Sequence, residues 1–313
     1  MTGLTALALA ATACGLTWWA LAGVTSLAAP RLLRYVERFG PADRSWCVLG
    51  LALSPLVLAV AVTALVFVPP LSVLAVDGHC HGSACGAHVP FVGGPNPAFI
   101  LFSVIAGGVI IGLVVVAALA LWRAISITRM FAALTRPGAD GSFRVLDCDG
   151  VIACCVGIWQ PSVVVSRSLA ARADPGQLRI VLLHEYAHAC RCDNLRNLLA
   201  GIATLPWPRA RRRRVLEALH NAADQCCDEF VAREIGDPGR VANTISLVSE
   251  WSDGPGAGFD GAVGQRIDRL LQSGRERGQL VRICAFVIPL AIVVIAAAAP
   301  ALHYCAEAFL RLL

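Results

Sequence analysis

Three long stretches of this sequence contain no charged residue, and each is long enough to cross a lipid bilayer. They cover residues 2–30, 47–76 and 78–122. A transmembrane helix needs roughly 20 consecutive apolar residues, and a further apolar run lies near the C-terminal end. The sequence therefore predicts four transmembrane helices, at about residues 3–29, 48–68, 99–122 and 283–302.

The composition agrees with a membrane protein. Only 15% of the 313 residues are charged and 57% are hydrophobic, whereas soluble domains contain about a quarter charged residues. A disordered chain is also excluded, because it could not keep so much apolar surface in water. We therefore expect an integral membrane protein in contact with the lipid bilayer.

The arginines predict the orientation in the membrane. All 26 basic residues are arginine; the short loop 31–46 contains four of them and the loop 69–98 contains none. Basic residues are enriched in cytoplasmic loops. We therefore predict a multi-pass protein of the plasma membrane with the N-terminus, the loop 69–98 and the C-terminus outside. Every arginine except Arg311 then lies on the cytoplasmic side.

Three regions follow from this topology. Residues 1–122 contain the first three spans, residues 123–282 form a cytosolic domain, and residues 283–313 contain the fourth span with a short extracytoplasmic tail. The expected fold is a membrane bundle of four α-helices with an α+β cytosolic domain.

The cytosolic domain shows signals for both strands and helices. Residues 143–157 and 161–168 are rich in Val and Ile and predict a β-hairpin or small sheet. Asp174 followed by Pro175 predicts a helix start, because aspartate caps a helix and proline suits its first turn. A charged helix is predicted over residues 209–235, ended by Gly236.

The motif His184-Glu185-Tyr186-Ala187-His188 lies on the helix that Asp174 begins. Residues four apart share one helix face, so both histidines can bind one Zn²⁺. Glu185 then lies beside the metal, where it can act as general base for a water molecule. The sequence therefore predicts a zinc metallopeptidase with Glu185 as its catalytic residue.

A third metal ligand is expected on the charged helix. Asp224 and Asp228 lie one turn apart, so one can bind the metal while the other hydrogen-bonds a histidine ligand. His220 shares their face and is the rival third ligand. Cys226 and Cys227 are interpreted as packing residues, as cysteines on a helix face usually are.

Several of these segments resemble one protein family. The residues are H-E-Y-A-H, Asp193 in H-A-C-R-C-D-N-L, the pair Cys227-Asp228, and R-I-D-R-L-L at 266–271. Together they resemble the BlaR/MecR-type membrane metallopeptidases, which are gluzincin-like antirepressors related more distantly to the HtpX and CAAX-prenyl-protease peptidases.

The resemblance implies a gluzincin-like domain that holds one zinc ion through His184, His188 and Asp224. The family usually has glutamate where this chain has Asp224, and Asp193 and Asp228 are expected to orient the ligands. The implied function is cleavage of a cytoplasmic DNA-binding repressor of the BlaI/MecI kind, with self-cleavage. Only about ten residues follow the last predicted span, so we expect no penicillin-binding sensor domain and a separate sensor protein as partner.

Two other functions remain open at this point. One is a membrane quality-control protease of the HtpX kind, which would degrade many substrates. The other is a non-catalytic membrane sensor or scaffold in which Asp224 impairs the metal site.

Three further features have alternative interpretations. Cys80 and Cys85 lie in the predicted outer loop, where an oxidising compartment permits a disulfide, but nearby histidines also permit a metal-sensing loop. Arg211–Arg214 are expected to contact anionic lipid headgroups or to solvate a helix start, and no direct nucleic-acid binding is expected. Gly108 and Gly112 permit close helix packing, inside the bundle or in a homo-oligomer.

Overall fold

A computed structural model gives the fold of the chain. It describes residues 3–68, 71–72, 78–81, 84–86, 97–138, 141–253, 261–271, 295, 297–305 and 307. The described chain is mostly helical, with a small mixed sheet and a separate two-stranded hairpin.

Three helices of the described chain are long and apolar enough to cross a membrane. They are α1 (Gly3–Val36), α2 (Pro41–Phe67) and α4 (Pro97–Leu134). All three extend beyond the predicted spans. The predicted loop 31–46 is largely helical, because α1 continues to Val36 and α2 already begins at Pro41, where proline suits the first helical turn.

The fourth predicted span falls mostly outside the described residues. Its described end, residues 297–305, is helical, and Ala299 packs against Val62 and Val66 of α2. The predicted outer loop is described only in part, as an antiparallel hairpin of β1 (His79–His81) and β2 (Ala84–Gly86). The backbone places Cys80 opposite Cys85, and the disulfide stays a prediction.

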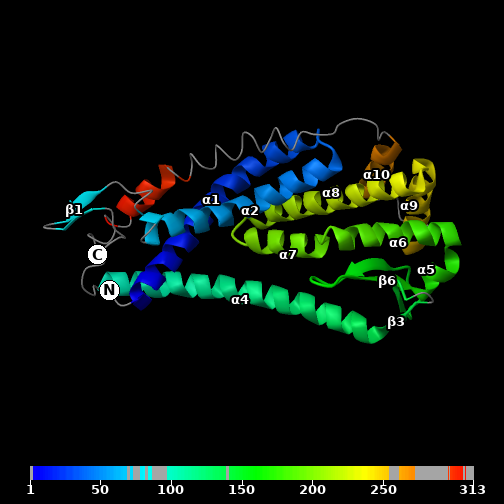
Figure 1. Cartoon of the computed structure of the whole chain (residues 1–313), viewed down its shortest axis with the longest axis horizontal. Coiled ribbons are helices and arrows are strands. Elements are labelled where there is room, and N and C mark those ends of the chain that lie inside the picture. The colour runs from blue at the N-terminus through cyan, green and yellow to red at the C-terminus, as the bar shows by residue number, and fades with distance from the viewer. Residues whose placement is uncertain are drawn as a thin grey trace.

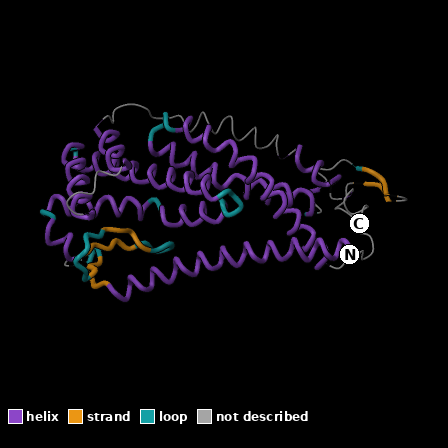
Figure 2. Tube along the Cα trace, turned by 180° about the vertical axis from the view of Figure 1, so that it is seen from behind, coloured by secondary structure: helices purple, strands orange, loops and turns teal. Residues whose placement is uncertain are grey.

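The predicted small sheet is present and has four strands. They are β3 (Thr135–Pro137), β4 (Arg144–Leu146), β5 (Ala153–Val156) and β6 (Ser162–Ser166). Their order is β3-β4-β6-β5; β4 and β6 are parallel and the other pairs antiparallel. In the described sheet β5 is an edge strand. Figure 2 shows the sheet between α4 and the remaining helices.

In the part of the chain described up to residue 271, six helices follow the sheet in sequence. They are α5 (Arg167–Arg172), α6 (Pro175–Cys190), α7 (Asp193–Ala203), α8 (Arg209–Ile235), α9 (Pro238–Asp253) and α10 (Gly261–Leu271). The predicted start of α6 is confirmed: the Asp174 side chain accepts hydrogen bonds from the backbone of Gly176 and Gln177. The predicted bounds of α8 are also confirmed, and Gly236 ends it with a left-handed φ of 74°.

The helices α7 and α8 share a hydrophobic core with the apolar helices α1 and α2. Trp18 and Ala22 of α1 and Val48 of α2 are buried in one cluster with Val215 and Leu219 of α8. The indole Nε1 of Trp18 also donates a hydrogen bond of 3.2 Å to the carbonyl oxygen of Ala203. Figure 1 shows α8 lying along α1 and α2, with the four-stranded sheet at the end of the molecule opposite β1.

Candidate metal centre

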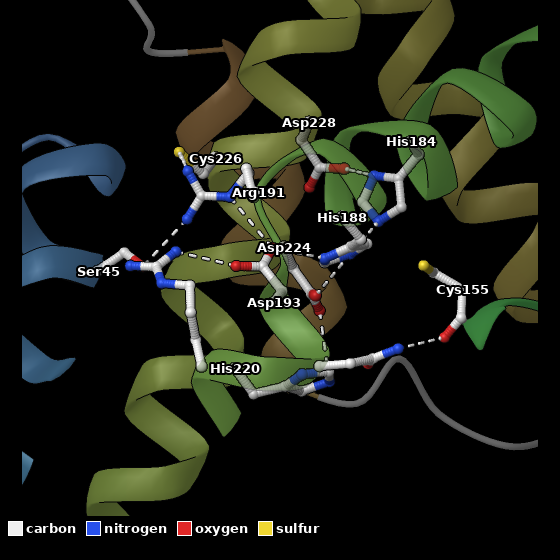
Figure 3. Close-up of polar contacts among 12 residues, drawn as sticks. Ser45, Cys155, His184, His188, Arg191, Asp193, His220, Asp224, Cys226 and Asp228 are labelled. Atoms are coloured by element: carbon white, nitrogen blue, oxygen red, sulfur yellow. Dashed lines mark hydrogen bonds and ion pairs between the residues drawn. The ribbon is translucent and has the colours of Figure 1, made fainter. Parts of the chain in front are cut away.

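Three of the predicted metal-site residues meet between α6 and α8. His184 and His188 lie one turn apart on α6, and their Nε2 atoms are 3.2 Å apart. The Oδ1 atom of Asp224, on α8, is 3.4 Å from the His188 Nε2 atom. One potential ligand atom from each of the three residues lies within 4.8 Å of the others, so all three could bind a single ion (Figure 3).

The other nitrogen of each histidine contacts a buried carboxylate. His184 Nδ1 is 2.9 Å from Asp228 Oδ1, and His188 Nδ1 is 2.9 Å from Asp193 Oδ2. A carboxylate only accepts hydrogen bonds, so both Nδ1 atoms donate. In a neutral imidazole held this way the Nε2 lone pair is free to bind a metal. Both lone pairs are therefore directed toward the same region, beside Asp224.

The electrostatics of this cluster favour a cation. Burial alone would lower the pKa of His188, but hydrogen bonds with Asp193, Asp224 and Cys227 raise it to about 12. Burial likewise disfavours the charged form of Asp224, yet His188 and Arg266 lower the pKa of its carboxyl group. The carboxylates are thus ionised at neutral pH and hold a proton on His188, and a metal cation would have to displace that proton from Nε2.

Asp228 is held by an ion pair with the half-buried Arg266. Its side chain is 1% exposed and accepts hydrogen bonds of 2.7 Å and 2.8 Å from Nε and Nη2 of Arg266, on α10. Burial alone would raise the pKa of Asp228, but Arg266 and His184 lower it to about 2. The ion pair therefore keeps Asp228 negatively charged and fixed in place as the partner of His184.

Asp193 is positioned by a tight turn and by two arginines. Cys192, just before α7, adopts a left-handed φ of 53°, which returns the chain toward His188. Asp193 accepts hydrogen bonds from Arg191 Nε (3.1 Å) and Arg196 Nη1 (2.9 Å). Both arginines also donate to the hydroxyl of Ser45 on α2, at 3.1 Å and 3.0 Å. A residue of α2, a candidate membrane-spanning helix, is thus linked through Asp193 to the candidate metal ligand His188.

Sequence reasoning did not assign roles to Ser45, Arg191, Arg196 or Arg266. Arg266 lies in the segment that resembles the family motif, which is the one signal that could have indicated it. Ser45 gave no signal, because a single serine near the start of an apolar helix has no distinctive pattern. Its contact with Arg196 spans 151 positions of the sequence.

His220 lies at the edge of the cluster. Its side chain is 64% exposed, and its Nε2 atom is 3.8 Å from Asp224 Oδ2. It does not belong to either group of residues whose ligand atoms converge in the described chain. The geometry therefore brings Asp224, rather than His220, together with the two histidines.

Cys226 and Cys227, on α8, lie next to Arg191 and His188 respectively. Cys227 is fully buried, and its sulfur, with His188 and Asp193, forms a second group of converging ligand atoms. Cys226 accepts a hydrogen bond of 2.9 Å from Arg191 Nη1. This second group shares only His188 with the first.

No protein-family model matches the sequence, and no curated protein or solved structure matches it either. The chemistry of the site is therefore argued from its residues. Two imidazole nitrogens and one carboxylate oxygen form the donor set that catalytic zinc sites use, with a fourth position left for water or substrate. The hydrogen-bonded Nδ1 atoms complete the arrangement expected around such ligands. The residues present fit a zinc ion.

A cavity of about 310 Å³ opens beside His184 and Glu185. Most of its lining is apolar and comes from four elements around the site: Val151, Ile152, Ala153, Ile180, Val181, Val231, Val241, Ile245 and Val248. In the described part of the chain no side chain donates a hydrogen bond to the Glu185 carboxylate, so it is available to a water molecule. The site thus combines a candidate base, a candidate metal-binding group and an adjoining apolar cavity.

Proposed function

We propose that this chain is an integral-membrane zinc endopeptidase of the BlaR/MecR type. His184, His188 and Asp224 would hold one zinc ion. The observation that supports this most strongly is the convergence of the two Nε2 atoms, each on a histidine whose Nδ1 is hydrogen-bonded to a buried carboxylate. Such hydrogen bonds fix ring orientation and tautomer around catalytic metals.

Glu185 would transfer protons during hydrolysis. A bound zinc ion supplies Lewis acidity and makes water a stronger nucleophile at neutral pH. Glu185 accepts the proton of the attacking water as general base, and then donates it to the leaving amine as general acid. Asp193 and Asp228 keep the two imidazoles oriented while this proton moves.

The substrate would lie between the edge strand β5 and the metal centre. β5 contacts α6, and residues 151–153 line the cavity beside Glu185. An extended peptide can add to an exposed strand edge through backbone hydrogen bonds, while side-chain pockets select its sequence. The apolar lining therefore favours a hydrophobic substrate side chain next to the cleaved bond.

The proposed substrate is a cytoplasmic DNA-binding repressor of the BlaI/MecI kind, with self-cleavage of the chain as a second reaction. The motif resemblance and the concentration of arginine in 31–46 and 123–282 support a cytosolic active site. A peptidase specific for a repressor would have one main protein substrate, whereas a quality-control peptidase would have many. The number of proteins that accumulate when the peptidase is inactivated therefore separates the two functions.

Removing the metal should abolish proteolysis. Chelation with 1,10-phenanthroline of the purified full-length protein, in detergent, is expected to stop cleavage of a mixed peptide library, and added Zn²⁺ should restore it. The readout is peptide fragments identified by mass spectrometry. Cleavage that continues after chelation, with no zinc measurable in the protein, would show that the activity is not that of a zinc peptidase.

The third ligand can be identified by comparing two substitutions. Asp224→Ala should reduce zinc affinity by more than the roughly 10–100-fold that loss of an outer-shell partner costs, because a direct ligand is removed. His220→Ala, on the same helix face, should keep about one zinc per chain, because His220 is not among the converging ligand atoms of the described chain. Zinc content is measured by elemental analysis after dialysis. Retention of zinc in Asp224→Ala together with its loss in His220→Ala would make His220 the ligand.

A further inference from the structure

A second and larger cavity lies away from the metal centre. It has a volume of about 1450 Å³ and lies between the α1–α2 hairpin and the helices α8 and α10. Its lining contains more basic than acidic side chains: Arg38, Arg44, Arg214, Arg233 and Arg269 against Glu37, Glu217 and Glu229. The cavity therefore has an excess of positive charge.

Arg44 is the buried member of this group. The residue is 9% exposed, and its guanidinium donates a hydrogen bond to Gln225 on α8. Its Nε atom is buried and has no hydrogen-bond partner among the described residues. A buried charged donor without an acceptor is costly, so an acceptor supplied by a ligand would stabilise this arrangement.

The acidic side chains of the lining do not balance the arginines. Glu217 pairs with Arg213, outside the cavity, at 3.3 Å. Glu229 is the shared electrostatic partner of Arg44, Arg233 and Arg269. Glu37 also acts on Arg44. Four arginines of the lining, Arg38, Arg44, Arg214 and Arg233, thus face the two carboxylates of Glu37 and Glu229, so positive charge remains in excess.

The four consecutive arginines Arg211–Arg214 do not share one partner. Arg211 donates to the Ser26 hydroxyl at 3.2 Å and Arg212 to the Gly201 carbonyl at 3.1 Å, while Arg213 pairs with Glu217. Only Arg214 lines the cavity. The lipid contact of the run stays a prediction, and the cavity draws its arginines from three helices, α2, α8 and α10, and from the α1–α2 turn.

We propose that this cavity binds a phosphate-bearing ligand, with Arg44 and Arg233 as the anion-binding residues. A planar guanidinium matches a phosphate through two parallel hydrogen bonds. Leu33, Val36 and Val48 provide an apolar wall beside the arginines. The phosphate can belong to an anionic phospholipid headgroup or to a soluble phosphate compound, since both present the same oxygens.

Binding can be measured by calorimetry on the full-length protein in a phosphate-free, non-ionic detergent. The two probes are inorganic phosphate and a short-chain phosphatidylglycerol. Saturable binding to the wild type is expected, and Arg44→Gln and Arg233→Gln should weaken it at least about tenfold, because each removes a charge-assisted hydrogen bond. Arg233 is exposed, so its variant tests the site even if Arg44→Gln misfolds. Arg209→Gln is the matched control on α8 and should bind as the wild type does, because Arg209 is exposed and does not line the cavity.

The probes distinguish the two sources of phosphate. Comparable binding of both probes assigns a soluble phosphate compound, and binding of the lipid alone assigns a headgroup; either result supports the site. The proposal is overturned if neither probe binds the wild type saturably, or if Arg44→Gln and Arg233→Gln bind as tightly as Arg209→Gln.

Discussion

Glu185→Gln should lower the rate of peptide hydrolysis by about 10²–10⁴-fold, the usual contribution of a general base, and leave zinc binding unchanged. Glutamine keeps the shape of the side chain but cannot accept the proton of the attacking water. The carboxylate is not among the converging ligand atoms of the described chain, so the metal should stay. Hydrolysis is followed with a fluorogenic peptide chosen from the library screen, and zinc by elemental analysis. Full activity of Glu185→Gln would refute its role as base.

Glu234→Gln is the matched control for this variant. Glu234 is exposed on α8 and does not line the cavity beside the metal centre, so its substitution should leave the rate unchanged. Comparing the cellular proteomes of wild type and Glu185→Gln then separates the candidate functions. Accumulation of one intact DNA-binding protein supports cleavage of a repressor, whereas accumulation of many membrane proteins supports quality control.

Asp228→Asn should destabilise the protein by about 3–5 kcal/mol, the cost of breaking a buried ion pair by removing one partner. The change leaves Arg266 without its bidentate carboxylate, and it removes the group that holds His184. Zinc affinity should therefore also fall by about 10–100-fold. Thermal unfolding in detergent, measured with and without zinc, separates the effect on folding from the effect on metal binding.

Asp147→Asn provides the comparison for a surface ion pair. Asp147 and Arg167 are 2.7 Å apart, with side chains 55% and 65% exposed. Such pairs contribute about 0–1 kcal/mol, so this variant should unfold close to the wild-type temperature. If Asp228→Asn were as stable as Asp147→Asn and bound zinc equally well, Asp228 would have no positioning role.

Local signals in the sequence predicted the elements that build the site. An N-cap aspartate followed by proline fixes the start of α6, and glycine after Ile235 fixes the end of α8. The four-residue spacing of His184 and His188 on α6 is likewise a local property. These features depend on neighbours within one or two helical turns, which the sequence displays directly.

Long-range contacts could not be predicted in the same way. β3 was missed because α4 continues to Leu134 and leaves only three residues for the strand, with no alternating pattern. The contacts of Ser45 with Arg196 and of Asp228 with Arg266 depend on how α2, α7, α8 and α10 pack. A charged residue on a helix gives no sequence signal of which distant charge it meets.

The hydroxyl of Ser45 has a consequence for how this protein can be handled. A fragment that began at Arg123 would keep every candidate metal ligand but would lose Ser45, the acceptor shared by Arg191 and Arg196. It would also expose Val215 and Leu219 of α8, which are buried against α1 and α2. The helices α1 and α2 therefore form part of the hydrophobic core of the domain that contains the metal centre. Detergent or lipid that loosens α2 should disturb His188 through Asp193, without touching the site itself.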